Sequence, residues 1–147
     1  MSGSIVPVSQ SSILMLDAWP VLEWLKGRDP AKTKFRELLL DAEAGRLSLE
    51  MSRINHGEVR YSIIKDFPSA RVSSALKALD EIPLLLHSVD DTLIDEAVVL
   101  KGQFKISYAD AFAAAQAIRR NLPLVTGDKE LRALETAGLV QLHWLGA

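Results

Sequence analysis

The chain has 147 residues, 48% of them apolar and 24% charged, as expected for one globular domain with a substantial core. The absence of cysteine excludes disulfides, thiolate zinc sites and a cysteine nucleophile. A net charge of −2 argues against a broadly basic nucleic-acid surface, although a local patch or bound cations could still receive phosphate. No apolar run approaches the roughly 20 residues of a spanning helix, and no basic residue precedes Lys26. The sequence therefore predicts a cytoplasmic protein without a signal peptide.

The first half of the chain alternates short apolar runs with helix-length amphipathic stretches. Residues 1–12 are polar and serine-rich, and we expect a flexible N-terminal tail there. Gly27 and Gly45 are expected to end the first two helices, Pro30 suits a first helical turn, and Ser52 can cap a helix. The expected elements are a strand over 13–16, helices over 18–26 and 30–44, a strand over 47–51, and helices over 52–66 and 68–81.

The second half continues the same alternation. Strands that alternate with helices predict an α/β fold, in which helices cover both faces of a central parallel sheet of about five strands. There is no internal repeat and no sign of a second domain, so residues 13–147 are expected to form a single domain. The remaining elements are a strand over 82–87, a helix over 90–101 that Gly102 interrupts, a helix over 107–120, a strand over 122–126, a short helix over 129–136 and a strand over 140–145.

Four carboxylates occupy element ends or apolar surroundings. Asp17 closes the first strand, and Asp128 lies just past the fourth. Glu58 lies in the second turn of the helix after the second strand, and Asp110 in the first turn of the helix that returns to the fourth strand. Ligands of parallel sheets bind outside the carboxyl ends of the strands. The topology therefore predicts that these acids meet at one edge, although 41, 52 and 18 residues separate them along the chain.

Each acid also has a purely structural interpretation. Asp17 and Asp128 could be helix N-caps. Asp110 forms, with Ser107, the S-x-x-D pattern of a capping box, and Glu58 could be a member of a salt bridge. Taken one at a time, these interpretations compete evenly with a functional one. It is the joint placement of the four acids that favours a shared site.

The sequence around Asp110 and Glu58 indicates that these two acids are not simply exposed to solvent. Asp110 opens the alanine-rich stretch 111–117, whose small side chains suit close packing on several sides. On a helical wheel at 100° per residue, Glu58 lies about 40° from Ile54 and about 60° from Tyr61, which predicts an apolar stripe around it. A buried acid needs a partner.

Such a cluster requires a cation. Two carboxylates ~4 Å apart repel by about 4 kcal/mol at an effective dielectric of 20. All-oxygen ligands favour Mg²⁺ or Mn²⁺ over zinc, and His56, His87 and His143 are too scattered to argue otherwise, so we interpret them as structural or surface residues. One or two hard cations could orient a phosphodiester and activate water without a protein nucleophile.

Four segments, 14–18, 55–59, 106–111 and 124–129, resemble the acidic blocks of PIN-domain ribonucleases, especially the VapC-type toxins of bacterial toxin–antitoxin systems. The resemblance extends over residues 13–145, with the blocks in the family's order. It implies a three-layer α/β/α PIN-like fold and an endoribonuclease, a hydrolase that cleaves RNA phosphodiester bonds with Mg²⁺ or Mn²⁺. It also implies a homodimer and a small antitoxin protein as partner.

The resemblance also assigns residues. Thr126 and Asn55 match supporting positions, although they could equally be a strand-end threonine and a helix-start asparagine. Ala18 departs from the serine or threonine that often follows the first acid, which puts one polar contact in doubt. The positions matched as catalytic and metal-binding are Asp17, Glu58, Asp110 and Asp128.

Substrate contacts are poorly specified by the sequence. Trp19 and Trp24 could form a groove for an antitoxin helix or a dimer contact, but core packing explains them as well. Two basic groups could touch phosphates or simply be solvated. They are Arg28, Lys32, Lys34 and Arg36 after the first helix, and Arg53, Arg60 and Lys65 around Glu58.

Two other functions compete with a nuclease. A phosphoacceptor receiver domain shares the parallel sheet and an acidic pocket. It needs an aspartate at the end of the third strand, where this chain has Leu86 and His87, and a lysine after the fifth strand, which is missing. A catalytically silent PIN-like binding protein is the other alternative, and the intact set of acids argues against it.

Overall fold

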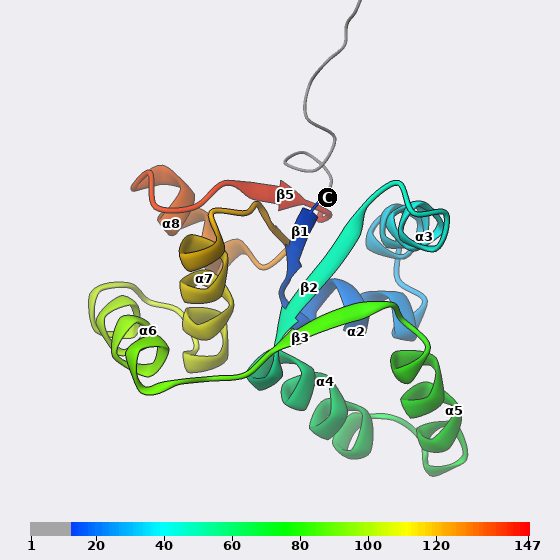
Figure 1. Ribbon diagram of the computed structural model, residues 1–147. Coiled ribbons are helices and arrows are strands. Elements are labelled where there is room, and N and C mark those ends of the chain that lie inside the picture. The colour runs from blue at the N-terminus through cyan, green and yellow to red at the C-terminus, as the bar shows by residue number, and fades with distance from the viewer. Residues whose placement is uncertain (1–12) are drawn as a thin grey trace, which may run out of the picture.

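A computed structural model describes residues 13–147, so the tail expected at residues 1–12 lies outside the described part of the chain. Figure 1 shows a central sheet with helices on both of its sides. All strand pairs are parallel, and the order is β3-β2-β1-β4-β5. This confirms the predicted three-layer α/β/α architecture with five strands. The strands are β1 (Ile13–Leu16), β2 (Ser48–Ser52), β3 (Leu84–His87), β4 (Leu124–Thr126) and β5 (Leu142–Trp144).

The strand order also excludes the receiver domain that was considered as an alternative function. Receiver domains have the doubly wound order 2-1-3-4-5, whereas here β1 lies between β2 and β4. The receiver alternative is therefore wrong for this chain.

The helices lie close to their predicted positions. Gly27 adopts a left-handed φ of 73° directly after the first helix, as expected for a glycine that ends it. Gly102, however, does not interrupt helix α6, which begins at Asp91 and continues to Gln103; one exposed glycine costs a helix only about 1 kcal/mol. The helices are α2 (Ala18–Lys26), α3 (Ala31–Glu43), α4 (Arg53–Asp66), α5 (Ser69–Asp80), α6 (Asp91–Gln103), α7 (Tyr108–Arg120), the 3₁₀ turn η1 (Lys129–Leu131) and α8 (Arg132–Thr136).

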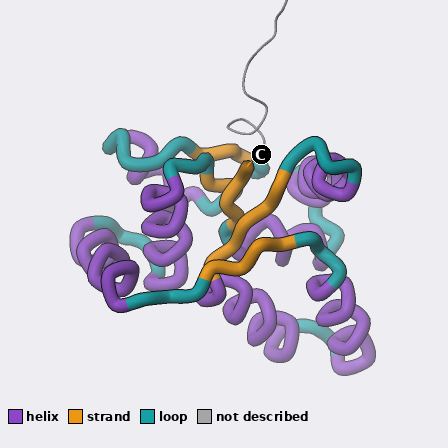
Figure 2. The backbone as a smooth tube through the Cα atoms, viewed as in Figure 1, coloured by secondary structure: helices purple, strands orange, loops and turns teal. Residues whose placement is uncertain are grey.

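Two hydrophobic cores fill the space between sheet and helices. Leu14 and Leu16 of β1 point into the core under α2 to α5, whereas Met15 between them points into the core under α6 to α8. This alternation is the expected result of a strand covered on both faces. Figure 2 shows helices on either side of the strands. Among residues 13–147, no helix has both the length and the apolar character needed to cross a membrane.

The helix α7 is the most enclosed helix on its side of the sheet. Every residue from Asp110 to Ala117 is buried. Five of these side chains are alanines, so α7 can pack closely against α6, α4 and the sheet at once. This packing holds the first turn of α7, and with it Asp110, beside the carboxyl ends of the central strands.

Candidate metal centre

Three of the predicted acids form a compact group. Asp17, Asp110 and Asp128 each offer one carboxylate oxygen, and these three oxygens lie within 4.8 Å of one another. Asp17 follows β1 and Asp128 follows β4, and these strands are hydrogen-bonded neighbours. The strand order reverses between them, which is where ligand crevices form in open α/β sheets. The topology therefore explains why residues so distant in sequence meet here.

Glu58 does not belong to this compact group, but it lies near it. Its charge contributes to the raised pKa values of both Asp17 and Asp110. The apolar stripe predicted around Glu58 is not buried, since Ile54 is 38% and Tyr61 56% exposed, so that prediction was wrong. The buried face of α4 is instead formed by Asn55, Val59 and Ile63. Glu58 reaches the site from the border between these two faces.

The structure also tests the capping interpretations. Asp17 is at the N-cap position of α2, yet its side chain makes no capping bond to the described chain. Ser107 caps α7 by accepting from the Asp110 N–H at 3.0 Å, and this bond does not use the Asp110 carboxylate. Asp128 does cap, since its Oδ1 accepts from the Glu130 N–H at 3.0 Å. Capping therefore accounts for one of these three carboxylates.

Two buried polar side chains support the acids. The Thr126 hydroxyl donates to Asp17 Oδ2 at 2.8 Å and accepts from the Asp128 N–H at 3.1 Å. Asn55 Nδ2 donates to the Ala109 carbonyl at 3.0 Å, one residue before Asp110. Thr126 thus joins the ends of β1 and β4, and Asn55 joins α4 to the start of α7.

Burial makes the charged forms of the acids unfavourable. It raises the pKa of Asp17, a shift that the Thr126 hydroxyl opposes and the charge of Glu58 increases. It also raises the pKa of Asp110, where the charge of Asp17 adds to the effect. The pKa of Glu58 is raised for the same first reason. An electropositive partner would reverse these shifts.

The donor set suits a hard divalent cation. Asp17 Oδ1, Glu58 Oε1 and Asp110 Oδ2 are buried and accept no hydrogen bond from residues 13–147. Buried polar atoms without a partner are unfavourable, and a cation would satisfy several at once. All three are carboxylate oxygens, the ligand type that Mg²⁺ and Mn²⁺ prefer. The residues present therefore fit such an ion.

The aromatic and basic residues have mixed roles. Trp24 packs against Phe35 with 5.7 Å between ring centroids, which is the core packing considered for it. In the first basic group, Arg28 forms an ion pair with Glu23 at 3.5 Å. The basic residues of α4 are exposed as well, but they form no ion pair within residues 13–147: Arg53, Arg60 and Lys65.

Comparison with known proteins identifies the family. The family model of the PIN domain matches residues 14–136, most of the chain. This chain belongs to the PIN-domain family. The comparison with curated proteins finds no match.

Solved structures share the fold of this PIN domain. A chain in VapBC2 from Rickettsia felis, bound to a DNA fragment from its promoter, is 18% identical with a TM-score of 0.66, and the match covers 89% of this chain and 97% of that one. VapBC-5 from Mycobacterium tuberculosis is 19% identical with a TM-score of 0.61 over 89% and 97%. The same organism's VapC20, a sarcin–ricin loop cleaving toxin, is 14% identical with a TM-score of 0.65 over 88% and 98%. The PIN domain thus has the fold of VapC toxins.

Proposed function

We propose that this PIN domain is an endoribonuclease that hydrolyses RNA phosphodiester bonds with the help of Mg²⁺ or Mn²⁺. The observation that carries the proposal is a set of buried carboxylate oxygens that accept no hydrogen bond from residues 13–147. Asp17 contributes one after β1, Glu58 one from the second turn of α4, and Asp110 one from the first turn of α7. The family supports nuclease activity in general, and VapC20, which has the same fold, is a sarcin–ricin loop cleaving toxin.

Each acid has a role in this proposal. Asp17, Asp110 and Asp128 would hold the cation, with Glu58 as the fourth carboxylate from α4. When bound, a divalent cation supplies a Lewis acid for the phosphate and lowers the pKa of a water molecule. Thr126 orients the Asp17 carboxylate through its hydroxyl. Because burial disfavours the negative charge of Asp17 and Asp110, the partner that would stabilise their charged forms is a cation.

The test is a set of single acid-to-amide variants. Asp17→Asn, Glu58→Gln, Asp110→Asn and Asp128→Asn should each abolish Mn²⁺-dependent RNA cleavage while the protein stays folded. Mn²⁺ should raise the melting temperature of the wild type, because an ion that binds only the folded state stabilises it. Asp66→Asn, at an exposed acid on the last turn of α4, is the matched control and should cleave normally.

Three results would decide against the proposal. RNA cut equally well by the Asp17→Asn protein would place the activity elsewhere. No thermal response to Mn²⁺ or Mg²⁺ would remove the metal from the mechanism. RNA binding without cleavage by the wild type would favour the catalytically silent alternative.

The partner we propose is a small antitoxin. VapBC2 and VapBC-5 are toxin–antitoxin assemblies, and the structural match to this PIN domain covers 97% of the matched chain in each of them. A toxin of this kind is encoded beside its inhibitor, so a short neighbouring open reading frame for a DNA-binding protein would support the assignment. Co-expression should yield a stable complex in which RNA cleavage is inhibited, whereas a neighbour that neither binds nor inhibits would contradict it.

The proposal includes a homodimer, supported by two exposed apolar rows. Figure 1 shows α4 and α6 both leaving the lower end of the sheet. The row on α4 has basic neighbours and the row on α6 has acidic ones, so two copies could pair α4 with α6 twice around a two-fold axis. The α4 row is Ile54, Tyr61 and Ile64 beside Arg53, Arg60 and Lys65, and the α6 row is Ile94 and Val98 beside Asp91 and Asp95.

A further inference from the structure

Gly127 lies directly under the indole ring of Trp19. A Cβ at Gly127 would be 2.3 Å from both Cη2 and Cζ3 of Trp19, and 2.8 Å from Cζ2. These distances are far inside van der Waals contact, so no larger residue fits while the indole stays in place. Gly127 does not have the left-handed φ of Gly27 or Gly45. The need for glycine at this position therefore comes from the ring, not from the backbone conformation.

The ring itself is firmly held. Trp19 lies in the first turn of α2, two residues after Asp17, and packs against the core that β1 and β4 share with α2 to α5. It is partly buried. An indole is rigid and has only two side-chain torsions, so a tryptophan anchored in a core cannot easily move aside. The contact thus connects the helix that follows Asp17 with the loop that carries Asp128.

Within residues 13–147, hydrogen bonds fix the two neighbours of Gly127 but not Gly127 itself. Thr126 is held by its hydroxyl bonds to Asp17 Oδ2 and to the Asp128 N–H. Asp128 is held by its bond from the Glu130 N–H. Glycine between them has the widest choice of backbone conformations. The indole limits that freedom, because it closes the space on one side of the Gly127 Cα.

We propose that Trp19 is a positioning residue for the metal centre, which keeps the Asp128 carboxylate at ligand distance by packing its indole against Gly127. This inference rests on the proposed metal-dependent function. It also implies that positions 19 and 127 act as a pair, since a side chain at 127 requires a smaller one at 19.

The pair is tested with Gly127→Ala, Trp19→Leu and the double variant. Gly127→Ala should weaken Mn²⁺ binding about 10- to 100-fold, the usual effect of losing a group that orients a metal ligand. Adding Trp19→Leu should restore most of the affinity, because leucine leaves room for the new methyl group. Calorimetric titration gives the Mn²⁺ affinity, and the Mn²⁺ concentration for half-maximal RNA cleavage should shift in parallel while kcat at saturating Mn²⁺ changes less.

The control is Trp24→Leu. Trp24 lies on the same helix and packs into the same core, against Phe35, but the three atoms nearest to a Cβ at Gly127 all belong to Trp19. This variant should lose stability and keep its Mn²⁺ affinity at a temperature where it is folded. Equal loss of Mn²⁺ affinity in Trp24→Leu and Trp19→Leu would overturn the inference, because general destabilisation would then explain both.

Two further results would overturn it. One is a Gly127→Ala protein that binds Mn²⁺ as tightly as wild type, and the other is a double variant no better than Gly127→Ala. Wild-type protein that binds no Mn²⁺ would instead contradict the proposed function. In that case urea unfolding still tests the contact, since strictly additive effects of the two substitutions would show that positions 19 and 127 are not coupled.

Discussion

Thr126 makes two of the hydrogen bonds that order the acidic cluster. Its hydroxyl donates to Asp17 and accepts from the N–H of Asp128, so one side chain sets the distance between two proposed ligands. The residue is fully buried, and no water can take over either bond without opening the strand ends. The resemblance to PIN-domain ribonucleases implied a supporting role for Thr126, the last residue of β4, and these two hydrogen bonds are the physical basis on which we propose that role.

Thr126→Val removes the hydroxyl and keeps the shape of the side chain. We expect a loss of about 1–3 kcal/mol in the free energy of unfolding, because two buried polar groups lose their partner. Mn²⁺ binding should weaken as well, since Asp17 would no longer be oriented. Urea unfolding and Mn²⁺ titration measure the two effects. Thr126→Ser keeps the hydroxyl and should stay close to wild type in Mn²⁺ affinity; a valine variant with wild-type values in both experiments would contradict the interpretation.

The sequence predicted correctly that three of the acids lie close together, but it did not predict which face of α4 is buried beside them. Asp17, Asp110 and Asp128 were predictable as neighbours because strand ends and helix starts are fixed by local patterns and by the topology of parallel sheets. The face of α4 was misread, since Ile54 and Tyr61 on one side compete with Val59 and Ile63 on the other. Which row faces the core depends on packing partners that a single sequence does not reveal.

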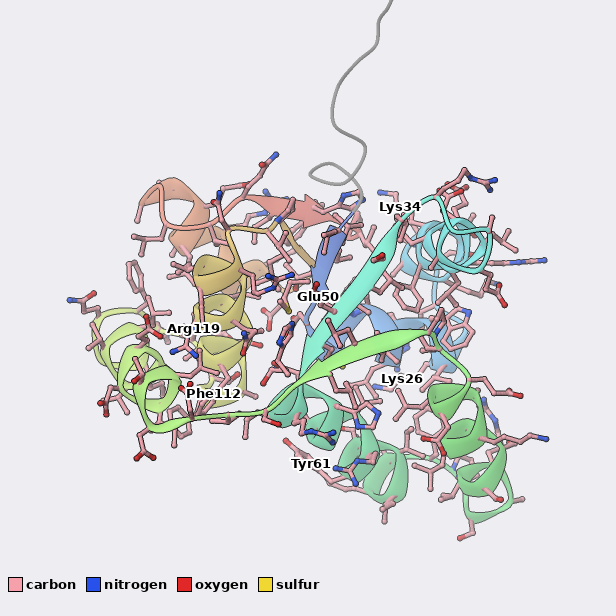
Figure 3. All side chains as sticks on the ribbon, viewed as in Figure 1. Lys26, Lys34, Glu50, Tyr61, Phe112 and Arg119 are labelled. Atoms are coloured by element: carbon pink, nitrogen blue, oxygen red, sulfur yellow. The ribbon has the colours of Figure 1, made fainter. Side chains whose placement is uncertain are left out.

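Glu50 connects β2 to β3 and α7, and its local sequence gives no sign of this role. It is buried in the middle of β2, on the face that looks toward α7 (Figure 3). Arg120, 70 residues away, donates to both of its carboxylate oxygens at 2.8 and 2.7 Å, and His87 of β3 lies 2.6 Å from Oε1. A glutamate that alternates with apolar residues is expected to face solvent. Only the tertiary structure shows that its side chain connects β2 with β3 and α7.

This ion pair predicts a specific pH dependence. The bonds from Arg120 lower the pKa of Glu50 below its ordinary 4.5. Because the folded state binds this proton less readily than the unfolded state, the pair stabilises the fold above pH 4.5 and is lost as the pH falls through the lowered pKa. Urea unfolding at neutral and acidic pH should show a smaller acid-induced loss for Glu50→Gln than for wild type. Glu50→Gln should also be less stable at neutral pH, because Arg120 loses its charged partner.

Arg120→Leu provides the complementary measurement. It leaves the buried carboxylate with His87 as its remaining partner, which should cost about 1–3 kcal/mol at neutral pH. Without the guanidinium, the pKa of Glu50 should rise, so the acid transition should move to higher pH. Equal acid dependence in wild type, Glu50→Gln and Arg120→Leu would mean that other carboxylates account for it.

Element boundaries were predictable where residue chemistry fixes them locally. Gly27 ends α2 and Ser52 caps α4, accepting from the Ile54 N–H at 3.2 Å. The strands β3 and β4 start later than expected, at the residues that follow Pro83 and Pro123. Proline lacks the N–H that a sheet ladder requires. The apolar runs were therefore longer than the strands, because hydropathy does not show that a proline lacks the backbone N–H donor.

At the level of the whole molecule, charge is distributed unevenly although the net charge is only −2. The acids of the metal centre lie at the carboxyl ends of β1 and β4, whereas exposed arginines line α4 beside them. Under the proposed function, these arginines would place positive charge beside the acids that an RNA phosphate approaches. The same arginines flank the apolar row that we assign to the dimer contact, so dimer formation and substrate binding would draw on adjacent parts of one helix.

Charge reversal tests the dimer at this level. Arg60→Glu places a negative charge on α4 opposite the acidic α6 of the second copy, and like charges across an interface cost several kcal/mol. The variant should therefore sediment as a monomer under conditions where wild type is a dimer. Adding Asp95→Arg should restore the dimer, because the charges of the two helices are then exchanged. Arg46→Glu, exposed before β2 at the opposite edge of the sheet, is the control and should remain dimeric. A monomeric wild type, or a double variant as monomeric as Arg60→Glu, would rule out this pairing of α4 with α6.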